Sequence, residues 1–357
     1  MFTIDVAAVP PAYIRPIDAE LRGSIAEVSY SVYNYIDESR RLVTNQDIST
    51  EEVGRETVRG EAITKKCIVY LPAGYDQDDP ETRYNVLYLL HGVGGNRFEW
   101  LNGGGQVGGN YVICNILDNL IANGEIDPVI VVFPEGRSAH NWTDTSFNAA
   151  GTNLLGFYYF DYELRYDLIP FIESTYNTYA DISDISPEGI ERNRKHRAIA
   201  GLSMGGMQAL NLAVGGYRCD SSIYTGTPGA WGNWLDTTVL APGMEDLFAY
   251  VGAFSQAPTS SDGKTLGASI ASSSRGLDLL YVTCGDADGV AFRSGYAPSI
   301  DGLAEAAGDK LRHFYQVVMA GGGHDFKVWN NGAYNFVRLA FGKLDGLSLP
   351  QTVEVNI

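Results

Sequence analysis

The stretch AIAGLSMGGMQALNL centres on Ser203, with glycines two positions before it and two positions after it. A serine in this setting belongs either to a flexible turn or to a sharp strand-to-helix bend that exposes a nucleophile. A short, mostly apolar run over 196–200 precedes the serine, and apolar residues recur at helical spacing after it. A Cβ at Gly201 or Gly205 would collide with such a bend. The pattern therefore predicts Ser203 as a nucleophile between a strand and a helix.

A serine hydroxyl is a poor nucleophile until a base takes its proton, and the sequence offers five histidines for this role. His324 fits best, because it follows the last strand-like run in GGGHDF, where three glycines let the backbone bend toward the serine. His196 and His313 lie in or beside strand patterns and are predicted to be structural. His91 is expected to shape a turn, and His140 lies in a long loop where it could line a cleft.

The carboxylate that orients the base should follow the strand LDLLYVTCG, because the chain order is then serine, acid, histidine. Asp286 and Asp288 both lie in the loop after this strand. We favour Asp288, since three residues past Gly285 the chain has cleared the strand end and can turn a carboxylate toward the imidazole. Asp286 is the alternative orienting acid; if it does not have this role, it is expected to be a solvated loop acid or a turn cap.

Acyl transfer also needs donors for the developing oxyanion, each worth about 3 kcal/mol when it is removed. The Met204 amide is one donor by the geometry of the bend. The second is predicted to be the Val93 amide, with Gly94 close behind, in the loop HGVGGNRFEW that follows the strand VLYLL. This glycine-rich turn lacks the Gly-Lys-Ser/Thr ending of a phosphate-binding loop.

These residues must be positioned by a framework in which apolar, β-rich runs alternate with helical segments, as in a mainly parallel sheet covered by helices. Eight strands are predicted near 25–35, 64–71, 85–91, 128–134, 196–201, 249–255, 278–284 and 312–319. Helices are predicted near 110–123, 160–177, 205–215, 299–308 and 330–342. No convincing helix joins the first two strands, so they are expected to pair antiparallel at the sheet edge.

We expect a single domain over 1–357, in which 1–60 supplies edge strands. Two stretches, 135–157 and 216–246, fit no regular element and are rich in Gly, Asn, Thr and Trp. Long segments of this kind are usually functional loops. The part over 217–245 is predicted to be a lid or pocket wall; its aromatic residues are Tyr224, Trp231 and Trp234. The competing interpretation makes these aromatic residues a small satellite core that pins the loop to the body.

The amino-acid composition limits the classes of partner that the chain is expected to bind. The chain of 357 residues has 43 acidic and 25 basic residues and a net charge of −18, which argues against nucleic acids and anionic membranes as partners. No window is long enough for a membrane span, and the N-terminus has no signal-peptide pattern. This predicts a cytoplasmic protein, or a secreted one if an export signal has been removed. The four cysteines, Cys67, Cys114, Cys219 and Cys284, are expected to be buried free thiols.

With these segments placed, the chain resembles the esterase D type of α/β-hydrolase and, within it, the feruloyl esterases of carbohydrate esterase family one. The matching segments are YLPAGYD at 70–76, YLLHGVGG at 88–95, DNLIANGEIDPVIVVFP at 118–134, HRAIAGLSMGG at 196–206, CGDAD at 284–288 and GGGHDFKVWNNGAYNF at 321–336. The resemblance implies Ser203 as nucleophile, Asp288 as acid and His324 as base. Compared with a compact member of the family, this chain inserts material around 181–193 and 217–245.

The predicted fold is thus an α/β-hydrolase with a mostly parallel eight-stranded sheet, helices on both faces and a loop or lid insertion. The predicted reaction is two-step hydrolysis of a carboxylic ester by a serine esterase, without a metal or organic cofactor. Substrate contacts are expected from Gly94, His140, Trp231, Trp234 and Trp329.

The resemblance implies a hydroxycinnamoyl ester as substrate, such as ferulate linked to arabinose on xylan or its oligosaccharides. An acetyl-xylan or general short-acyl carboxylesterase is the alternative within the same chemistry. The alternative from a different functional class is a non-catalytic relative that binds carbohydrate through Trp231 and Trp234. The expected partner is a small-molecule or oligosaccharide ester; the sequence indicates no oligomeric state.

Overall fold

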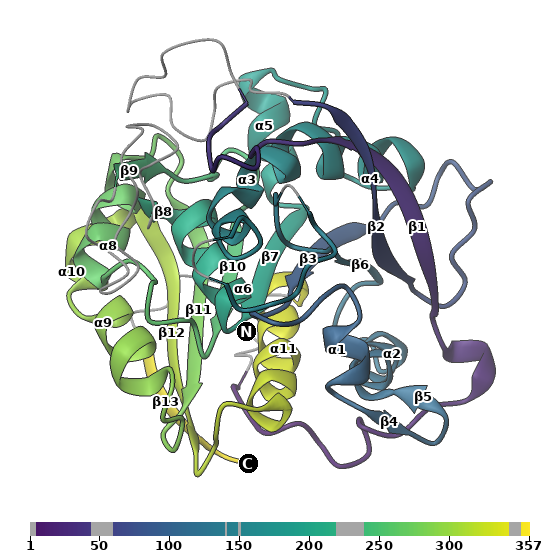
Figure 1. Ribbon diagram of the computed structural model, residues 1–357. Coiled ribbons are helices and arrows are strands. Elements are labelled where there is room, and N and C mark those ends of the chain that lie inside the picture. The colour runs from purple at the N-terminus through teal and green to yellow at the C-terminus, as the bar shows by residue number, and fades with distance from the viewer. Residues whose placement is uncertain (1–4, 44–59, 140, 149–150, 219–238, 343–350) are drawn as a thin grey trace.

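The computed structural model describes residues 5–43, 60–139, 141–148, 151–218, 239–342 and 351–357 (Figure 1). In these ranges a nine-stranded sheet runs in the order β1-β2-β6-β3-β7-β10-β11-β12-β13. Its strands are β1 (Ser24–Tyr33), β2 (Ala62–Leu71), β3 (Asn85–Leu90), β6 (Val129–Phe133), β7 (Arg197–Leu202), β10 (Tyr250–Phe254), β11 (Leu277–Gly285), β12 (Leu311–Ala320) and β13 (Gln351–Asn356). Two short hairpins pair β4 (Gln106–Val107) with β5 (Asn110–Tyr111) and β8 (Gly215–Arg218) with β9 (Val239–Pro242).

The sheet is mainly parallel, as predicted. β1 pairs antiparallel with β2, and β2 antiparallel with β6, whereas the pairs from β6 to β13 are parallel. The predicted antiparallel hairpin at the sheet edge is confirmed. The count of eight strands was too low, because β13 adds a ninth strand beside β12. Its sequence QTVEVN alternates polar and apolar residues but is only six residues long, so the sequence does not distinguish an edge strand from an irregular segment here.

The helices are α1 (Glu99–Asn102), α2 (Val112–Ala122), α3 (Phe160–Glu163), α4 (Ile169–Thr175), α5 (Pro187–Arg194), α6 (Met204–Gln208), α8 (Gly263–Ser272), α9 (Ala297–Ile300), α10 (Leu303–Ala307) and α11 (Phe326–Phe341). A turn of π-helix over Leu164–Leu168 joins α3 to α4, and another over Ala209–Val214 continues α6. No helix in the described part of the chain is long and apolar enough to cross a membrane.

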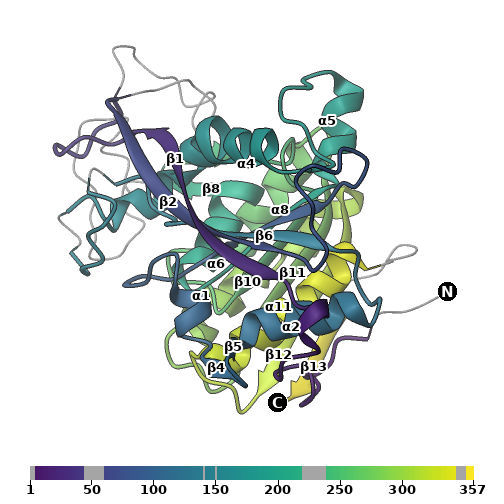
Figure 2. The ribbon, with the colours of Figure 1, turned by 90° about the vertical axis from the view of Figure 1, so that its right-hand side faces the viewer.

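Helices cover both faces of the sheet. Along β3, Val86, Tyr88 and Leu90 join one apolar cluster, whereas Leu87 and Leu89 join the other. The first cluster includes residues of α4 and α8, and the second includes residues of α1, α2 and α11. Figure 2 shows α4 and α2 on opposite sides of the strands. A strand buried on both faces needs an apolar residue at nearly every position, which explains the runs VLYLL and VIVVF.

Caps account for the main differences in helix boundaries. α11 starts four residues earlier than predicted because the Asp325 carboxylate accepts the amides of Lys327 at 2.9 Å and Val328 at 3.3 Å. Three helices were missed: the four-residue α1, α5 and α8. α5 starts at Pro187 after a Ser186 cap, and α8 follows an Asp262 cap; the sequences of α5 and α8 are too polar or too small to show a clear apolar stripe.

Candidate active site

Ser203 lies on a strained bend between the end of β7 and the start of α6. Its φ is 51° and its ψ is −114°, a conformation that side-chain-bearing residues rarely adopt. The Ser203 amide donates to the Phe254 carbonyl of the neighbouring strand at 2.9 Å. A Cβ on Gly201 would lie 2.5 Å from the Gly205 carbonyl carbon, and one on Gly205 would lie 2.5 Å from the His91 oxygen. The bend therefore requires both glycines, as the sequence predicted.

His324 connects this serine to a carboxylate. Its Nε2 lies 3.1 Å from the Ser203 Oγ, and its Nδ1 lies 2.7 Å from the Asp288 Oδ2. In the neutral tautomer with the proton on Nδ1, the ring donates to Asp288 and accepts the serine hydroxyl proton. Ser203 and Asp288 are buried, whereas the His324 side chain keeps 23% exposure. The arrangement can therefore move a proton from the serine to a ring that a substrate can approach.

Asp288 is held as a carboxylate. Its Oδ1 accepts the amides of Val290 at 2.9 Å and Ala291 at 2.8 Å, which leaves Oδ2 for the imidazole. Burial by itself raises the pKa of Asp288. The hydrogen bond from His324 and the Ala291 amide outweigh burial and lower this pKa to about 2. The carboxylate is therefore charged at neutral pH and can orient the ring.

Asp286, the alternative acid, has a different partner. Its Oδ1 accepts the Gly321 amide at 2.7 Å, and its own amide donates to the Met319 carbonyl at 3.2 Å. These bonds tie the end of β11 to the loop that leads to His324. Of the two acids, Asp288 is the one in contact with the imidazole.

The two predicted oxyanion donors lie in segments that meet at the serine. The Met204 amide is at the first position of α6, where the helix itself supplies no acceptor. In the turn after β3, the Gly92 amide donates to the Glu99 Oε2 at 2.8 Å, whereas the Val93 amide donates to no other described residue. A Cβ on Gly92 would lie 3.0 Å from the Ser203 Cβ, so this turn packs directly against Ser203.

Trp329, a predicted substrate contact, packs against His324. Its ring meets the His324 ring edge-to-face at a centroid distance of 5.1 Å, and it is 6% exposed. Gly94 lies beside Val93 with a φ of 78°, and a Cβ there would meet nothing within 4 Å. The other predicted substrate contacts, His140, Trp231 and Trp234, lie outside the described residues, as does most of the 217–245 segment.

The predicted structural roles of two histidines fit their surroundings. The His196 Nδ1 lies 2.7 Å from the Asn85 Oδ1, and its ring stacks on Tyr179 at 4.6 Å. His313 lies within β12. Cys67, Cys114 and Cys284 are buried free thiols as expected, and Cys219 lies outside the described residues.

Sequence reasoning missed Glu99, whose carboxylate accepts the Gly92 amide beside the active site. Burial raises the pKa of this carboxyl group; the hydrogen bond from the Gly92 amide, and then the nearby Arg137 charge, oppose the rise. The residue is part of the same HGVGGNRFEW segment, but a lone acid at a helix start gives no specific sequence signal.

A cavity of about 590 Å³ lies away from this site. Its walls are Gly216, Leu240, Ala241, Pro242, Lys264, Thr265, Ala268, Ser269 and Ser272. None of these is a member of the Ser203, His324 and Asp288 chain, so the cavity does not define the reaction centre. Nor does any group of three or more His, Cys, Asp or Glu residues in the described ranges form a potential metal site.

Comparison with known proteins finds similarity to an esterase family and to two xylanases. The family described as "Putative esterase" matches residues 64–219, which run from β2 past the Ser203 bend. Endo-1,4-beta-xylanase Y of Acetivibrio thermocellus is 40% identical over 161 residues, which are 45% of this chain and 12% of that protein. An endo-1,4-beta-xylanase/feruloyl esterase of Xylanibacter ruminicola is 29% identical over 263 residues, or 73% of this chain and 27% of that protein. The chain thus spans about an eighth and about a quarter of these two relatives.

Solved structures share the fold. The feruloyl esterase module from Clostridium thermocellum, as a mutant complexed with sinapinate, aligns with a TM-score of 0.59 at 24% identity, covering 98% of this chain and 100% of that chain. The CE1 ferulic acid esterase of Anaeromyces mucronatus, in complex with ferulic acid, aligns with a TM-score of 0.61 at 19% identity, covering 96% and 99%. The predicted α/β-hydrolase fold and its resemblance to feruloyl esterases are confirmed.

Proposed function

We propose that this chain, an α/β-hydrolase that resembles feruloyl esterases, is a serine esterase with Ser203 as nucleophile, His324 as base and Asp288 as orienting acid. One observation carries the proposal: a continuous chain of hydrogen bonds runs from the Asp288 carboxylate through the imidazole to the Ser203 hydroxyl. A merely structural serine would not need a positive φ and two glycines that touch backbone.

The reaction proceeds in two steps. As the Ser203 Oγ attacks the ester carbonyl, the His324 Nε2 takes its proton, and the Asp288 carboxylate stabilises the resulting imidazolium. The amides of Met204 and Val93 donate to the oxyanion. The imidazolium then protonates the departing alcohol, which leaves an ester between the acyl group and the serine. A water molecule, deprotonated by the same Nε2, cleaves this ester and restores the serine.

The proposed substrate is a hydroxycinnamoyl ester, such as ferulate esterified to arabinose on xylan or its oligosaccharides. Support comes from the two relatives, one named as a xylanase and one as a xylanase/feruloyl esterase. Further support comes from two neighbours of the same fold that hold sinapinate and ferulic acid. Acetylated xylan is the competing ester substrate.

The test compares the purified protein on methyl ferulate, 4-nitrophenyl acetate and acetylated xylan. We expect methyl ferulate to be hydrolysed with a higher kcat/KM than 4-nitrophenyl acetate, and little acetate to be released from xylan. Fast acetate release with slow methyl ferulate hydrolysis would move the substrate to acetyl esters while leaving the serine chemistry intact. Absence of turnover on all three would contradict the esterase itself and favour a carbohydrate-binding protein.

A further inference from the structure

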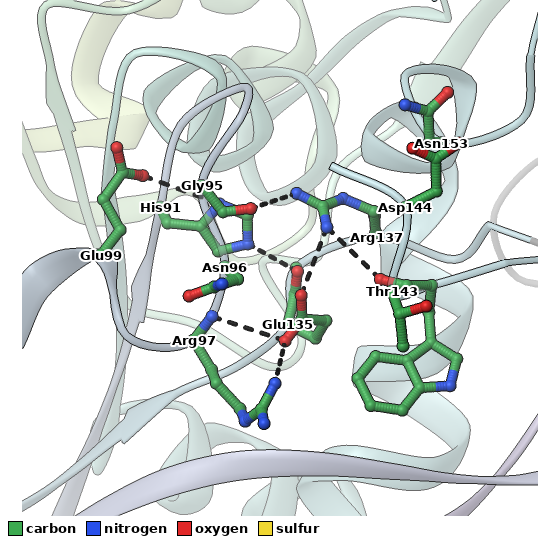
Figure 3. A network of polar contacts seen from close by, with 12 residues as sticks. His91, Gly95, Asn96, Arg97, Glu99, Glu135, Arg137, Thr143, Asp144 and Asn153 are labelled. Carbon is green, nitrogen blue, oxygen red and sulfur yellow. Dashed lines mark hydrogen bonds and ion pairs between the residues drawn. The ribbon is translucent and has the colours of Figure 1, made fainter. Parts of the chain in front are cut away.

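The turn that carries the Val93 amide packs against the loop that follows β6. Arg137, in that loop, has a side chain that is 1% exposed. Its Nη2 donates to the Gly95 carbonyl at 2.5 Å, and its Nη1 donates to the Glu135 Oε1 at 3.2 Å and to the Trp142 carbonyl at 3.3 Å (Figure 3). A planar guanidinium with three acceptors has a single orientation, so it fixes the position of Gly95.

Glu135, also 1% exposed, holds the residues on both sides of this turn. Its Oε2 accepts the Arg97 Nη1 at 3.0 Å and the Arg97 amide at 3.5 Å. Its backbone oxygen lies 2.5 Å from the Nε2 of His91, the residue before the turn (Figure 3). The 92–97 segment is therefore held before, within and after the Val93 amide.

The loop with Arg137 is itself anchored from behind. The buried Lys65 ammonium of β2 donates to the Arg137 carbonyl at 2.6 Å and to the Glu163 carboxylate at 2.5 Å. The Arg137 guanidinium also lies over the Phe157 ring at 5.1 Å. Removing one partner of a buried ion pair is costly, because the other charge is then left unpaired in the interior. The loop that carries Arg137 is thus tied to β2 and to Glu163.

We propose that Arg137 and Glu135 are positioning residues for the oxyanion site: they hold the 92–95 turn so that the Val93 amide meets the tetrahedral intermediate. The inference rests on the proposed esterase function. Neither side chain touches the reacting atoms; each acts through the backbone of the turn. Oxyanion donors work because they are held in place before the charge develops, and loss of one costs about 10²- to 10³-fold in kcat.

The test replaces Arg137 by lysine, which keeps the charge but has all its donors on one nitrogen, so it cannot reach the acceptors of both Nη1 and Nη2. Glu135→Gln is the second variant, because it keeps the shape and removes the charge. Arg194→Lys is the matched control. The Arg194 side chain is equally buried and also holds two backbone carbonyls, those of Glu245 at 2.6 Å and Gly276 at 2.9 Å, but it lies before β7, whereas Ser203 follows that strand.

Each variant is measured for kcat and KM on 4-nitrophenyl acetate, for melting temperature, and for inhibition by benzeneboronic acid, which forms a tetrahedral adduct with an active serine. We expect Arg137→Lys and Glu135→Gln to lower kcat about tenfold or more, with KM changed less than about threefold. Benzeneboronic acid should bind more weakly by a similar factor. Arg194→Lys should lower the melting temperature and leave kcat and boronate binding near wild type.

Equal kcat and equal boronate affinity in the Arg137, Glu135 and Arg194 variants would overturn the positioning role while leaving the esterase in place. A change in the Arg137 and Glu135 variants that appears only in KM or only in melting temperature would also overturn the positioning role. If one of the two variants fails to fold, the other decides by the same criteria. A wild-type protein that hydrolyses no ester would instead overturn the proposed function, and this inference with it.

Discussion

The chemistry proposed for single residues depends on the protonation of one aspartate and one histidine. Asp288 has two backbone amides on one oxygen and the imidazole on the other, and its pKa lies at about 2. The tautomer of His324 that can accept the serine proton is the one this carboxylate selects. The same carboxylate also stabilises the positive ring that forms as the serine attacks.

The first prediction separates the two aspartates. Asp288→Asn should lower kcat by about 10⁴-fold, because an amide at this position favours the wrong tautomer of His324. Asp286→Asn is the control: its amide oxygen can still accept the Gly321 amide, so activity should stay within about threefold of wild type. Steady-state kinetics on 4-nitrophenyl acetate measure both. An inactive Asp286 variant beside an active Asp288 variant would reverse the assignment.

The second prediction concerns His91, which lies against the carbonyls of Glu135 and Gly92. Burial, together with the nearby Arg137 charge, lowers the pKa of His91 to about 4, against 6.5 for an exposed ring; the two carbonyls oppose this only in part. Between these values the unfolded chain binds a proton that the folded chain does not. The stability contributed by the neutral ring is therefore present above pH 6.5 and is lost as the pH falls.

Urea unfolding at pH 7.5 and pH 5 measures this effect. From the two pKa values, the wild type should lose about 2 kcal/mol more unfolding free energy between these pH values than His91→Gln, which cannot titrate. Because each protein is compared with itself, the cost of the substitution cancels. Equal losses in the two proteins would mean that His91 is protonated in the folded state.

How far the sequence predicts these residues depends on how local their signals are. Ser203 and His324 lie in short glycine-rich segments, and the glycines themselves indicate that the backbone bends sharply there. Arg137 and Glu135 carry no such signal. The bond from Arg137 to the Gly95 carbonyl spans 42 positions, and only the pairing of β3 with β6 brings the two loops together.

At the scale of elements, the bend between β7 and α6 decides where Ser203 lies. Gly201 and Gly205 pack against each other inside the bend, and Gly205 also lies against the end of β3. These contacts are with backbone, which cannot move aside as a side chain can. The sequence predicted this element well because its steric requirement is local, whereas β13 depends on its pairing with β12, and α5 and α8 show no clear apolar stripe in their sequences.

The third prediction follows from these contacts. Gly201→Ala should lower the unfolding free energy by about 1 to 3 kcal/mol and reduce kcat, because the added methyl group pushes the bend apart. Gly289→Ala is the control, since a Cβ there would meet nothing within 4 Å and the residue is exposed. It should change stability by less than about 0.5 kcal/mol. Urea unfolding compares the two; a Gly201 variant as stable and active as the Gly289 variant would show that the bend tolerates a side chain.

At the scale of the whole molecule, the parallel strands bring together chemistry from distant parts of the chain. Ser203, Asp288 and the Val93 turn each follow the carboxyl end of a strand, namely β7, β11 and β3, and such ends meet at one edge of a parallel sheet. The topology explains why three segments separated by about 200 residues form one site. The predicted 217–245 lid or pocket wall lies mostly outside the described residues and stays a prediction.

The fourth prediction tests that lid. Trp231→Ala or Trp234→Ala should lower kcat/KM on a feruloylated oligosaccharide much more than on 4-nitrophenyl acetate, which is too small to reach a remote wall. Kinetics on the two substrates, together with melting temperatures, distinguish the alternatives. Equal losses on both substrates with a lower melting temperature would assign these tryptophans to a satellite core.

The most direct test of the central claim is titration of methyl ferulate hydrolysis with a fluorophosphonate, which modifies only an activated serine. We predict that activity falls in a straight line to zero at one equivalent, and that peptide mass spectrometry finds the phosphonyl group on Ser203. Ser203→Ala should neither react with the reagent nor hydrolyse methyl ferulate. Full activity after stoichiometric modification, or a phosphonyl group on a different residue, would contradict the assignment of Ser203 as the nucleophile.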